Sequence, residues 1–434
     1  MIGVVPRWLS RVVLIVFFVF CAWLPISASL SAELAKFDFG TGPVADGFVR
    51  VLPAQIYSAD VGFGFEAGSK GIEAVDRGGE DPVSRDFCTS KSPFYFSVKL
   101  PEGNYRVSVS LGDAAGSSRT TVKAELRRLM LENVGTANRV ESFTFAVNLR
   151  RPTIASGGEV RLKDREKTTE FWAWDEKLTL EFSGERPCVC GVTVEAVPEL
   201  PTLFLLGDST VCDQPREPFA SWGQMLTRFF TPEVVVANHA ESGESLRSSL
   251  GAKRLEKVLS VMRPGDWLFL QYGHNDMKAV GAVAYQADLK LFVQRTQQQG
   301  GRPVLVTPMQ RRTFDGDEII NSHRDFPDSV RELAAEMNLP LIDLHAASKQ
   351  LYEALGTVES ARAFATAMDG THHSNYGAYE LAKCIVQGIR VNRLPLTRFL
   401  REDVTAFDPA RPDSWKEFAV PASMQISGQR PEGD

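Results

Sequence analysis

Five residues of the types needed for acyl transfer stand in four short polar stretches in the second half of this 434-residue chain. Ser209 lies in GDST, directly after an apolar run. Gly243 lies in AESGES and Asn275 in GHND, and each follows a further apolar run. Asp369 and His372 share the late stretch DGTH. An apolar strand that ends in Gly and small polar residues is where a parallel-sheet protein places its chemistry, although an ordinary tight turn has the same composition.

Ser209, His372 and Asp369 together would make a nucleophilic triad. A serine hydroxyl is a poor nucleophile until a neighbouring base accepts its proton, and His372 is the predicted base. Asp369, three residues earlier, can accept a hydrogen bond from the other imidazole nitrogen, which fixes the tautomer and stabilises the imidazolium. Taken alone, Ser209 would more often cap a helix or a turn. The combination of residues favours catalysis.

The same stretches supply candidate donors for an oxyanion hole. A tetrahedral acyl intermediate needs hydrogen-bond donors aimed at its oxyanion. The backbone N–H groups of Ser209 and Gly243 and the side-chain amide of Asn275 would provide three. Glycine at position 243 allows the backbone to approach closely. The chain contains no G-x-S-x-G, which speaks against the α/β-hydrolase fold.

Short apolar runs alternate with amphipathic stretches throughout this half of the chain. Because buried parallel strands separated by helices produce this rhythm, the pattern predicts a parallel sheet covered on both faces. Ligands bind such sheets at the carboxyl ends of the strands, where the four polar stretches fall. The predicted strands are 203–206, 234–237, 267–270, 304–306 and 339–342, and the clearest amphipathic stretches are 328–337 and 376–389.

The chain before residue 198 has a different period. From residue 37 to about 197, apolar residues alternate with others in short runs, which predicts a β-sandwich. Residues 94–100 and 105–111, separated by Pro-Glu-Gly-Asn, predict a hairpin. The stretch PELP at 198–201 is typical of a linker.

Residues 1–32 have the pattern of a secretion signal. Arg7 and Arg11 precede an apolar run at 12–24, and small residues follow it. An uncleaved anchor is the alternative, but the apolar core is short for a membrane span. Without this segment the chain carries 46 basic and 54 acidic residues, a net charge of −8. That charge argues against nucleic acid or an anionic membrane surface as a partner.

The cysteine and histidine patterns favour neither a metal nor a cofactor. Five cysteines follow the signal segment, so at least one is free or pairs outside the chain. Cys188 and Cys190 are too close in sequence for a relaxed mutual bridge, and the pairing of the others is open. The chain has no Cys-x-x-Cys and no Cys/His cluster at zinc spacing. We therefore expect a site that works without a metal or cofactor.

In their order and spacing, the four stretches resemble the signature blocks of the SGNH/GDSL hydrolase superfamily. GDST, GHND and DGTHHSNYGAYELA are most similar to the rhamnogalacturonan acetylesterases. FDFGTG and WDEKLTLEF resemble the galactose-binding-like domain that often precedes such enzymes. The resemblance implies a flavodoxin-like α/β hydrolase domain with a parallel sheet after an all-β sandwich. The expected division is a signal at 1–32, a sandwich at 33–198, a hydrolase domain at 199–400 and a partly disordered tail at 401–434.

The resemblance implies an esterase that removes acetyl groups from an acetylated polysaccharide or oligosaccharide, with pectic rhamnogalacturonan as the expected polymer, and the signal segment predicts that it is secreted or periplasmic. Acetylated xylan, a lipid or a thioester would be the substrate under the same mechanism in the alternative interpretations. Polar residues after the nucleophile argue against a lipid: Asp213, Gln214, Arg216 and Glu217. A non-catalytic polysaccharide-binding protein is the competing class. We expect no stable membrane anchor after signal removal.

Several neighbouring residues have open assignments. Arg311 and Arg312 follow the predicted fourth strand, where a basic pair could meet a uronate carboxylate or belong to a solvated loop. His373 departs from the usual motif and is either structural or substrate-facing. His239 and His274 either line the cleft or fill the core. A further possibility is that the Asn275 loop is held by a hydrogen bond from the adjacent aspartate, Asp276.

Overall fold

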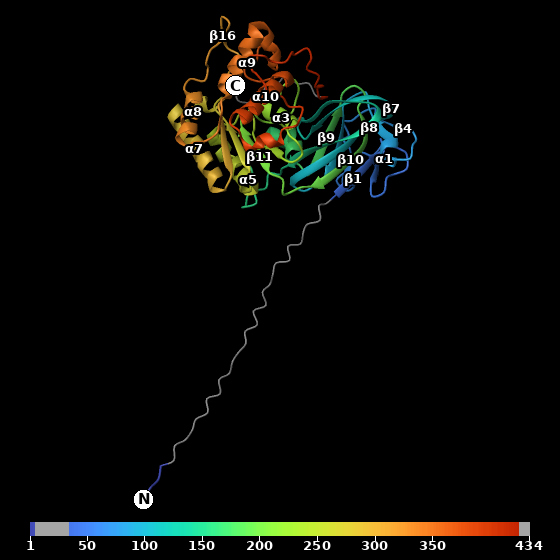
Figure 1. The fold of residues 1–434 in the computed structure, drawn as a ribbon, viewed down its shortest axis with the longest axis horizontal. Coiled ribbons are helices and arrows are strands. Elements are labelled where there is room, and N and C mark those ends of the chain that lie inside the picture. The colour runs from blue at the N-terminus through green and yellow to red at the C-terminus, as the bar shows by residue number, and fades with distance from the viewer. Residues whose placement is uncertain (5–33, 425–434) are drawn as a thin grey trace.

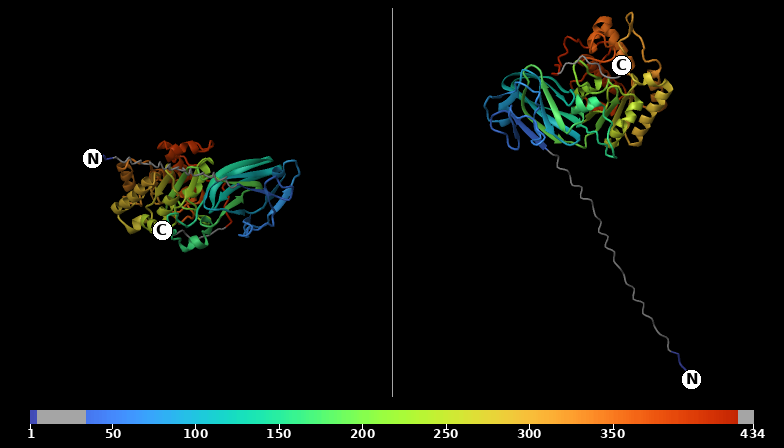
Figure 2. Two further views of the ribbon diagram at one scale, coloured as in Figure 1. Left: turned by 90° about the horizontal axis from the view of Figure 1, so that it is seen from below. Right: turned by 180° about the vertical axis from the view of Figure 1, so that it is seen from behind.

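The computed structural model describes residues 1–4 and 34–424. A β-rich N-terminal half lies beside an α/β C-terminal half, and the two are in broad contact (Figure 1, Figure 2). The predicted signal segment falls almost wholly outside the described residues.

The N-terminal half is one ten-stranded, mostly antiparallel sheet in the path β2-β1-β10-β7-β9-β6-β3, with β5 also on β10, β4 on β5 and β8 on β7. Its longest strands, β7 and β8, form a hairpin with 22 residues in each strand. The strands are β1 Leu34–Phe39, β2 Val49–Val51, β3 Phe63–Phe65, β4 Glu73–Asp76, β5 Asp86–Thr89, β6 Phe94–Lys99, β7 Gly103–Ala124, β8 Arg128–Leu149, β9 Lys177–Ser183 and β10 Cys188–Ala196.

The hairpin predicted from residues 94–100 and 105–111 is wrong in its pairing. Both runs are strands, but β6 pairs with β3 and β9, while β7 pairs with β8, β9 and β10. Both strands bury their alternate apolar residues in one core, including Phe96 and Val109. Alternation records which face of a strand is buried, and that information is the same whichever strand lies next to it.

The C-terminal half contains a five-stranded parallel sheet in the order β12-β11-β13-β14-β17. This is the flavodoxin-like order, which confirms the predicted fold class. The chain moves to one side of β11 for β12 and returns to the other side for β13, and sheets of this kind bind ligands in a crevice outside the carboxyl ends of such strands. The strands are β11 Thr202–Gly207, β12 Val235–Asn238, β13 Trp267–Gln271, β14 Arg302–Val306 and β17 Leu341–Ile342.

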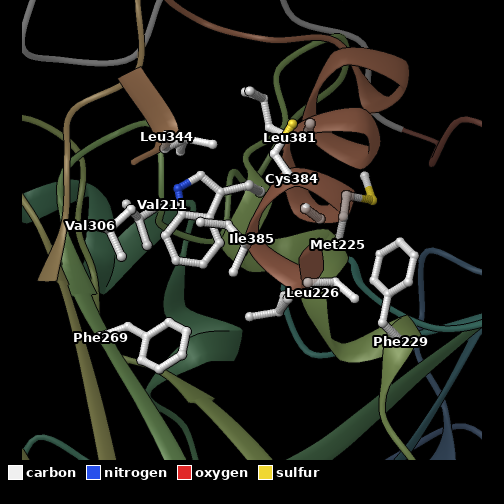
Figure 3. Packing of buried hydrophobic residues seen from close by; sticks show 14 of the residues in the cluster. Val211, Met225, Leu226, Phe229, Phe269, Val306, Leu344, Leu381, Cys384 and Ile385 are labelled. Carbon is white, nitrogen blue, oxygen red and sulfur yellow. The ribbon is translucent and has the colours of Figure 1, made fainter. Parts of the chain in front are cut away.

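Helices cover both faces of this sheet. Alternate residues of its strands therefore belong to two different cores. Leu205 and Phe269 face the core built with α3, α9 and α10 (Figure 3). Phe204 and Leu268 face the opposite core with α5, α7 and α8. The helices are α3 Trp222–Leu226, α4 Leu246–Gly251, α5 Arg254–Val261, α6 Asp276–Ala279, α7 Ala282–Gln298, α8 Phe326–Glu336, α9 Leu344–Glu359 and α10 Asn375–Val391.

Strand β8 connects the two halves, and smaller elements complete the fold. Leu129 of β8 belongs to the same core as α3 and α10, so the two halves share apolar packing. The small elements are α1 Pro82–Arg85, α2 Asp164–Thr168, the 3₁₀ turns Phe171–Ala173, Thr227–Phe229, Ser360–Ala363 and Pro395–Phe399, and the hairpin β15 Phe314–Asp315 and β16 Glu318–Ile319.

Residues 401–424, the first part of the segment expected to be a partly disordered tail, are ordered against the rest of the protein. This segment lacks helix or strand but packs against both halves, and it buries Phe407 and Val420. Near its end, the Ser423 N–H donates to Glu217 at 3.0 Å, and the Pro421 carbonyl accepts from Lys123 at 2.7 Å. A few spaced apolar side chains fix a segment whose average composition is polar. Residues 425–434 lie outside the described part.

The five cysteines of the described chain, Cys88, Cys188, Cys190, Cys212 and Cys384, are all free and buried. No helix in the described ranges combines the length and apolar character that crossing a membrane requires.

Candidate active site

The nucleophile loop begins where β11 ends. Gly207 closes the strand in a space that admits no side chain, since a Cβ there would lie 2.5 Å from Val211 and 2.6 Å from the Gln271 carbonyl oxygen. The chain can therefore turn tightly against β13 and present Ser209 at the crevice. Ser209 is only 2% exposed.

Ser209, His372 and Asp369 form a continuous hydrogen-bonded chain. His372 Nε2 lies 3.0 Å from Ser209 Oγ, and His372 Nδ1 lies 3.1 Å from Asp369 Oδ2. Asp369 Oδ1 accepts the backbone N–H groups of Thr371 and His372, both at 2.9 Å. With Nδ1–H donated to Asp369, the Nε2 lone pair faces the serine hydroxyl. This is the arrangement in which an imidazole can accept the serine proton.

Asp369 is held in its ionised form. Burial raises its pKa, but the hydrogen bond and charge of His372 and the two backbone N–H donors outweigh burial, and the pKa lies well below the usual range. A carboxylate that stays ionised in contact with the imidazole stabilises the imidazolium that forms during acyl transfer.

Polar side chains behind the nucleophile fix its loop. The backbone N–H and hydroxyl of Thr210 donate to Asp208 Oδ1 at 3.0 and 2.7 Å. Gln271 Nε2 donates to the Thr210 hydroxyl at 2.7 Å, and Trp222 Nε1 donates to Gln271 Oε1 at 2.7 Å. This buried relay ties the loop to β13 and α3.

The Asp208 carbonyl accepts the N–H groups of Val211 and Cys212 at 3.0 and 3.1 Å. Since that carbonyl and the Ser209 N–H belong to one planar trans peptide, fixing the carbonyl directs the N–H the opposite way.

Gly243 lies in a tight turn after β12. The Glu244 N–H donates to the Glu241 carbonyl at 3.3 Å, and Gly243 has a φ of +73°. In the described chain Ser242 is not among the residues with positive φ, so the turn matches type II, which favours Gly at its third position. Asn275 Nδ2 donates to the Glu244 carbonyl at 3.0 Å, which leaves its second amide hydrogen for another acceptor.

Asp276 ties the loops after β12 and β13 together, as the sequence suggested. Its Oδ1 accepts the N–H of Leu246 at 2.9 Å, and its Oδ2 accepts the N–H of Gly273 at 3.1 Å. Burial, and then the nearby charge of Asp208, raise the pKa of Asp276 to about 7 although these N–H groups lower it. The carboxyl acts as a brace between loops.

Comparison with known proteins relates each half to a family. Residues 205–378 match the GDSL-like lipase/acylhydrolase family, and residues 35–154 match the galactose-binding-domain-like family of β-agarase and YXIM esterase-like proteins. The rhamnogalacturonan acetylesterase RhgT of Bacillus subtilis (strain 168) is 40% identical over 212 residues, which cover 45% of this chain and 91% of RhgT. The chain belongs to the GDSL-like lipase/acylhydrolase family.

A longer relative matches both halves of this GDSL hydrolase. The uncharacterized esterase YxiM of Bacillus subtilis (strain 168) is 26% identical over 398 residues, which cover 88% of this chain and 98% of YxiM. A crystal structure of YxiM aligns with a TM-score of 0.45 at 23% identity, over 84% of this chain and 99% of that one. The protein is a carboxylic ester hydrolase with a galactose-binding-like domain before its catalytic fold.

His373 of this GDSL hydrolase does not face substrate. Its ring is fully buried, lies 2.7 Å through Nε2 from the Tyr352 hydroxyl and packs on Phe364 with ring centroids 4.7 Å apart. Burial, followed by the charge of His372, lowers its pKa to about 3. The structural alternative is therefore favoured, since His372 is directed to Ser209 while His373 is directed to Tyr352.

The contacts of His239 and His274 favour the core-filling alternative. Both are buried, at 2% and 1% exposure. His239 lies between the rings of Trp174 and Phe204, while His274 Nδ1 lies 3.2 Å from Nε2 of the buried His323. The neighbours of both rings are other buried side chains of the described chain.

The two arginines expected near the sugar have different surroundings. Arg311 is partly exposed, donates from Nε to the Thr371 hydroxyl at 3.2 Å and lies near Met277, two residues beyond Asn275. Arg312 instead donates to the Ser360 hydroxyl at 3.0 Å and the Thr357 carbonyl at 2.8 Å. Only Arg311 contacts a residue adjacent to His372, and Arg312 braces the loop after α9.

Three of the four polar residues named after Ser209 are buried, so they do not form a cleft lip. Asp213, Gln214 and Glu217 are buried, and two of them bind arginines of the N-terminal half: Asp213 pairs with Arg128 at 2.7 Å, and Glu217 pairs with Arg127 at 2.5 Å. The sequence shows that these residues are polar, but it does not show which residues they bind. Within the described residues, no group of three His, Cys, Asp or Glu is arranged to hold a metal ion.

Proposed function

We propose that the protein is a secreted or periplasmic carbohydrate esterase that removes O-acetyl groups from a polysaccharide, with pectic rhamnogalacturonan as the preferred substrate. Ser209 is the nucleophile, His372 the general base and then acid, and Asp369 the carboxylate that orients it. The observation that carries the proposal is the Ser209–His372–Asp369 chain, with contacts of 3.0 and 3.1 Å at the carboxyl edge of the sheet.

The reaction takes two acyl transfers. Ser209 Oγ attacks the acetyl carbonyl carbon while its proton passes to His372 Nε2, and the carbonyl oxygen becomes an oxyanion. The intermediate collapses as the C–O bond to the sugar breaks and His372 returns the proton to the sugar oxygen. Water then attacks the acetyl-enzyme with His372 again as base, releasing acetate. The N–H groups of Ser209 and Gly243 and the amide of Asn275 stabilise both oxyanions.

The substrate proposal is supported by two observations. The relative RhgT is named a rhamnogalacturonan acetylesterase, and it shares 40% identity with this chain. Arg311 places a partly exposed guanidinium beside the His372 loop, where a uronate carboxylate of a pectic chain would be neutralised. Because an acetyl group needs little acyl pocket, selectivity should come from such sugar contacts, whose binding energy orients the ester for attack.

The decisive experiment is acetate release from a panel of acetylated rhamnogalacturonan, acetylated xylan, p-nitrophenyl acetate and a long-chain p-nitrophenyl ester. We expect the highest kcat/KM on rhamnogalacturonan and the lowest on the long-chain ester. A preference for xylan or for long acyl chains would contradict the substrate while leaving the mechanism intact. No hydrolysis of any ester would favour the binding-protein alternative.

Arg311 and Arg312 form a matched pair for the sugar contact. Arg311→Gln should lower kcat/KM on the uronate-containing polymer about tenfold, the scale of one lost ion pair, and leave p-nitrophenyl acetate hydrolysis unchanged. Arg312→Gln should affect the two substrates equally because its donors bind the protein itself. Equal losses on both substrates for Arg311→Gln would remove Arg311 from the sugar site.

Secretion is tested separately. Expression of the full chain in a bacterium with its native N-terminus, followed by N-terminal sequencing of the exported protein, should show cleavage near residue 32. A full-length protein retained in the cell membrane would favour the uncleaved anchor.

A further inference from the structure

Two cations from the N-terminal half bind the carbonyl next to Gly243. Lys163, at the start of α2, donates from Nζ to the Ser242 carbonyl oxygen at 2.5 Å. Arg165, two residues later, donates from Nη2 to the same oxygen at 2.5 Å. These residues stand 79 and 77 positions before Ser242 in the chain. Neither belongs to a motif that marks catalysis.

The carbonyl they bind and the Gly243 N–H are two ends of one peptide group. In a planar trans peptide the C=O and N–H point in opposite directions, so holding the oxygen fixes where the hydrogen points. This peptide is also the central one of the turn from Glu241 to Glu244. Type I and type II turns differ mainly by a rotation of that peptide through roughly half a turn. The state of the Ser242 carbonyl therefore decides whether the Gly243 N–H faces the oxyanion.

We propose that Lys163 and Arg165 are positioning residues of the esterase: by binding the Ser242 carbonyl they lock the Gly243 N–H toward the oxyanion and strengthen it as a donor. This inference rests on the proposed function, in which Gly243 supplies one of three donors. Charge-assisted hydrogen bonds are about twice as strong as neutral ones, and a flipped peptide would lose two of them. Donation to the carbonyl also polarises the peptide, which makes its N–H a better donor.

The segment that carries the cations is anchored to the catalytic half. Glu166, the residue after Arg165, accepts two hydrogen bonds from Arg254 at the start of α5, at 3.0 and 2.7 Å. Glu166 also accepts from Trp174 Nε1 at 3.0 Å. All three of these side chains are buried. Lys163 and Arg165 therefore reach the turn from a fixed base.

The turn itself supplies the counter-charges. Arg165 pairs with the Glu241 carboxylate, and Lys163 pairs with Glu244 Oε1 at 3.0 Å. The first and last residues of the turn thus hold the same cations that hold its central carbonyl. This arrangement keeps the charge balanced while it restricts the turn to one conformation.

The test compares Lys163→Met with Lys167→Met on the full chain. Lys163 has a side chain 27% exposed, so the variant should fold, while Lys167, in α2, is 59% exposed and pairs with Asp164. With p-nitrophenyl acetate, Lys163→Met should lower kcat about tenfold with KM nearly unchanged, less than the loss of a whole oxyanion donor. Lys163→Met combined with Arg165→Met should lower kcat about a hundredfold. Lys167→Met should match the unmodified enzyme.

Inhibition by methylboronic acid provides the readout that a merely structural role would not move. Boron forms a tetrahedral adduct with Ser209, and one of its oxygens occupies the oxyanion position. The inhibition constant of Lys163→Met should rise by the factor by which kcat/KM falls. Lys163→Arg should restore most of the kcat, because a guanidinium can also donate to the carbonyl.

The outcomes separate this inference from the proposed function. If Ser209→Ala remains active, the proposed function fails whatever Lys163 does. If Ser209→Ala is inactive but Lys163→Met keeps its kcat and its boronate affinity, the positioning role is overturned and the esterase mechanism stands. A fall in kcat without weaker boronate binding would also overturn it. Should the double variant unfold, Lys163→Met alone decides.

Discussion

The two backbone donors of the proposed oxyanion hole are held in opposite ways. The peptide that ends in the Ser209 N–H has its carbonyl bound by the N–H groups of Val211 and Cys212, three and four residues after Asp208. The peptide that ends in the Gly243 N–H has its carbonyl bound by side chains 77 and 79 residues away. The first is fixed by its own turn, and the second depends on a different half of the molecule.

This difference shows how a preceding domain can take part in chemistry without touching substrate. A turn that satisfies its own carbonyl forms wherever its strand forms. A turn whose central peptide can flip needs a partner, and here α2 provides one. The N-terminal half therefore contributes to the geometry of the site, whether or not it also binds sugar.

Removal of the nucleophile should have the largest effect, because both backbone donors serve the reaction that Ser209 begins. Ser209→Ala keeps the Ser209 backbone N–H and both peptide arrangements but removes the attacking oxygen. We expect kcat on p-nitrophenyl acetate to fall by ~10⁴-fold or more, with unchanged circular dichroism. Near-normal activity would contradict the mechanism.

Asn275 binds the turn that contains Gly243, because its amide donates to the Glu244 carbonyl, and it offers its other amide hydrogen to the oxyanion. Asn275→Ala should lower kcat on the order of a hundredfold or more, the usual cost of one oxyanion donor. KM should change little. A variant that loses substrate affinity instead would show that Asn275 acts by binding the ground state.

Thr210→Val disrupts hydrogen bonds that fix the Ser209 loop. It can be compared with Lys163→Met, which disrupts a bond that holds the Gly243 turn. Thr210 is buried, and its hydroxyl links Asp208 to Gln271, so valine leaves a buried amide without its acceptor. We expect a loss of about 1–3 kcal/mol in unfolding free energy together with lower kcat. Lys163→Met should lower kcat with a smaller stability loss, under about 1 kcal/mol. Urea unfolding of both variants beside kinetics would reveal any failure of this separation.

The stability of the protein should also respond to alkaline pH through Glu170, which lies near Arg165 and Glu241. Burial, and then the charge of Glu241, raise the pKa of Glu170 to about 9, although Arg165 lowers it. A carboxyl whose folded pKa lies above its unfolded value contributes stability below about pH 4.3, and that stability is lost as pH rises toward 9. Glu170→Gln should therefore show a melting temperature that falls less between pH 6 and 9 than that of the unmodified protein.

The control for this pH effect is the exposed Glu185. Glu185→Gln should leave the pH dependence of the melting temperature unchanged. Parallel curves for Glu170→Gln and the unmodified protein would show that Glu170 does not titrate in this range.

Chelation should have the smallest effect of all. The proposed oxyanion donors and the groups that hold them are backbone and side-chain groups of the protein. EDTA should therefore leave kcat on p-nitrophenyl acetate unchanged. Activity that is lost in EDTA and restored by a divalent cation would contradict a mechanism without a metal.

Much of the C-terminal half could be predicted from the sequence, because its signals are local. The apolar run before Gly207 and the polar residues after it predict a strand followed by a loop, and the alternation with helices predicts the parallel sheet. Parallel strands with short connections bring Ser209, Gly243 and Asn275 to one edge. The three-residue spacing of Asp369 and His372 lets one side chain orient the other.

Other features could not be predicted because they depend on which surfaces meet. Alternation located β6 and β7 but not their partners. The doublet of His372 and His373 does not say which ring faces the crevice, and packing against Tyr352 decides it. The polar composition of residues 401–434 suggested a partly disordered tail, and the sequence did not indicate that a few apolar side chains would anchor residues 401–424 on both halves.

The amino-acid sequence by itself determined the reacting groups of this protein, because nucleophile, base and donors lie in short blocks whose turns carry the information. Only the tertiary structure decided what holds those groups in place. Lys163 and Arg165 have no local signal, since a cation on a short helix is equally compatible with solvent. Their contact with the Ser242 carbonyl exists because packing of the two halves brings α2 to the turn that contains Gly243.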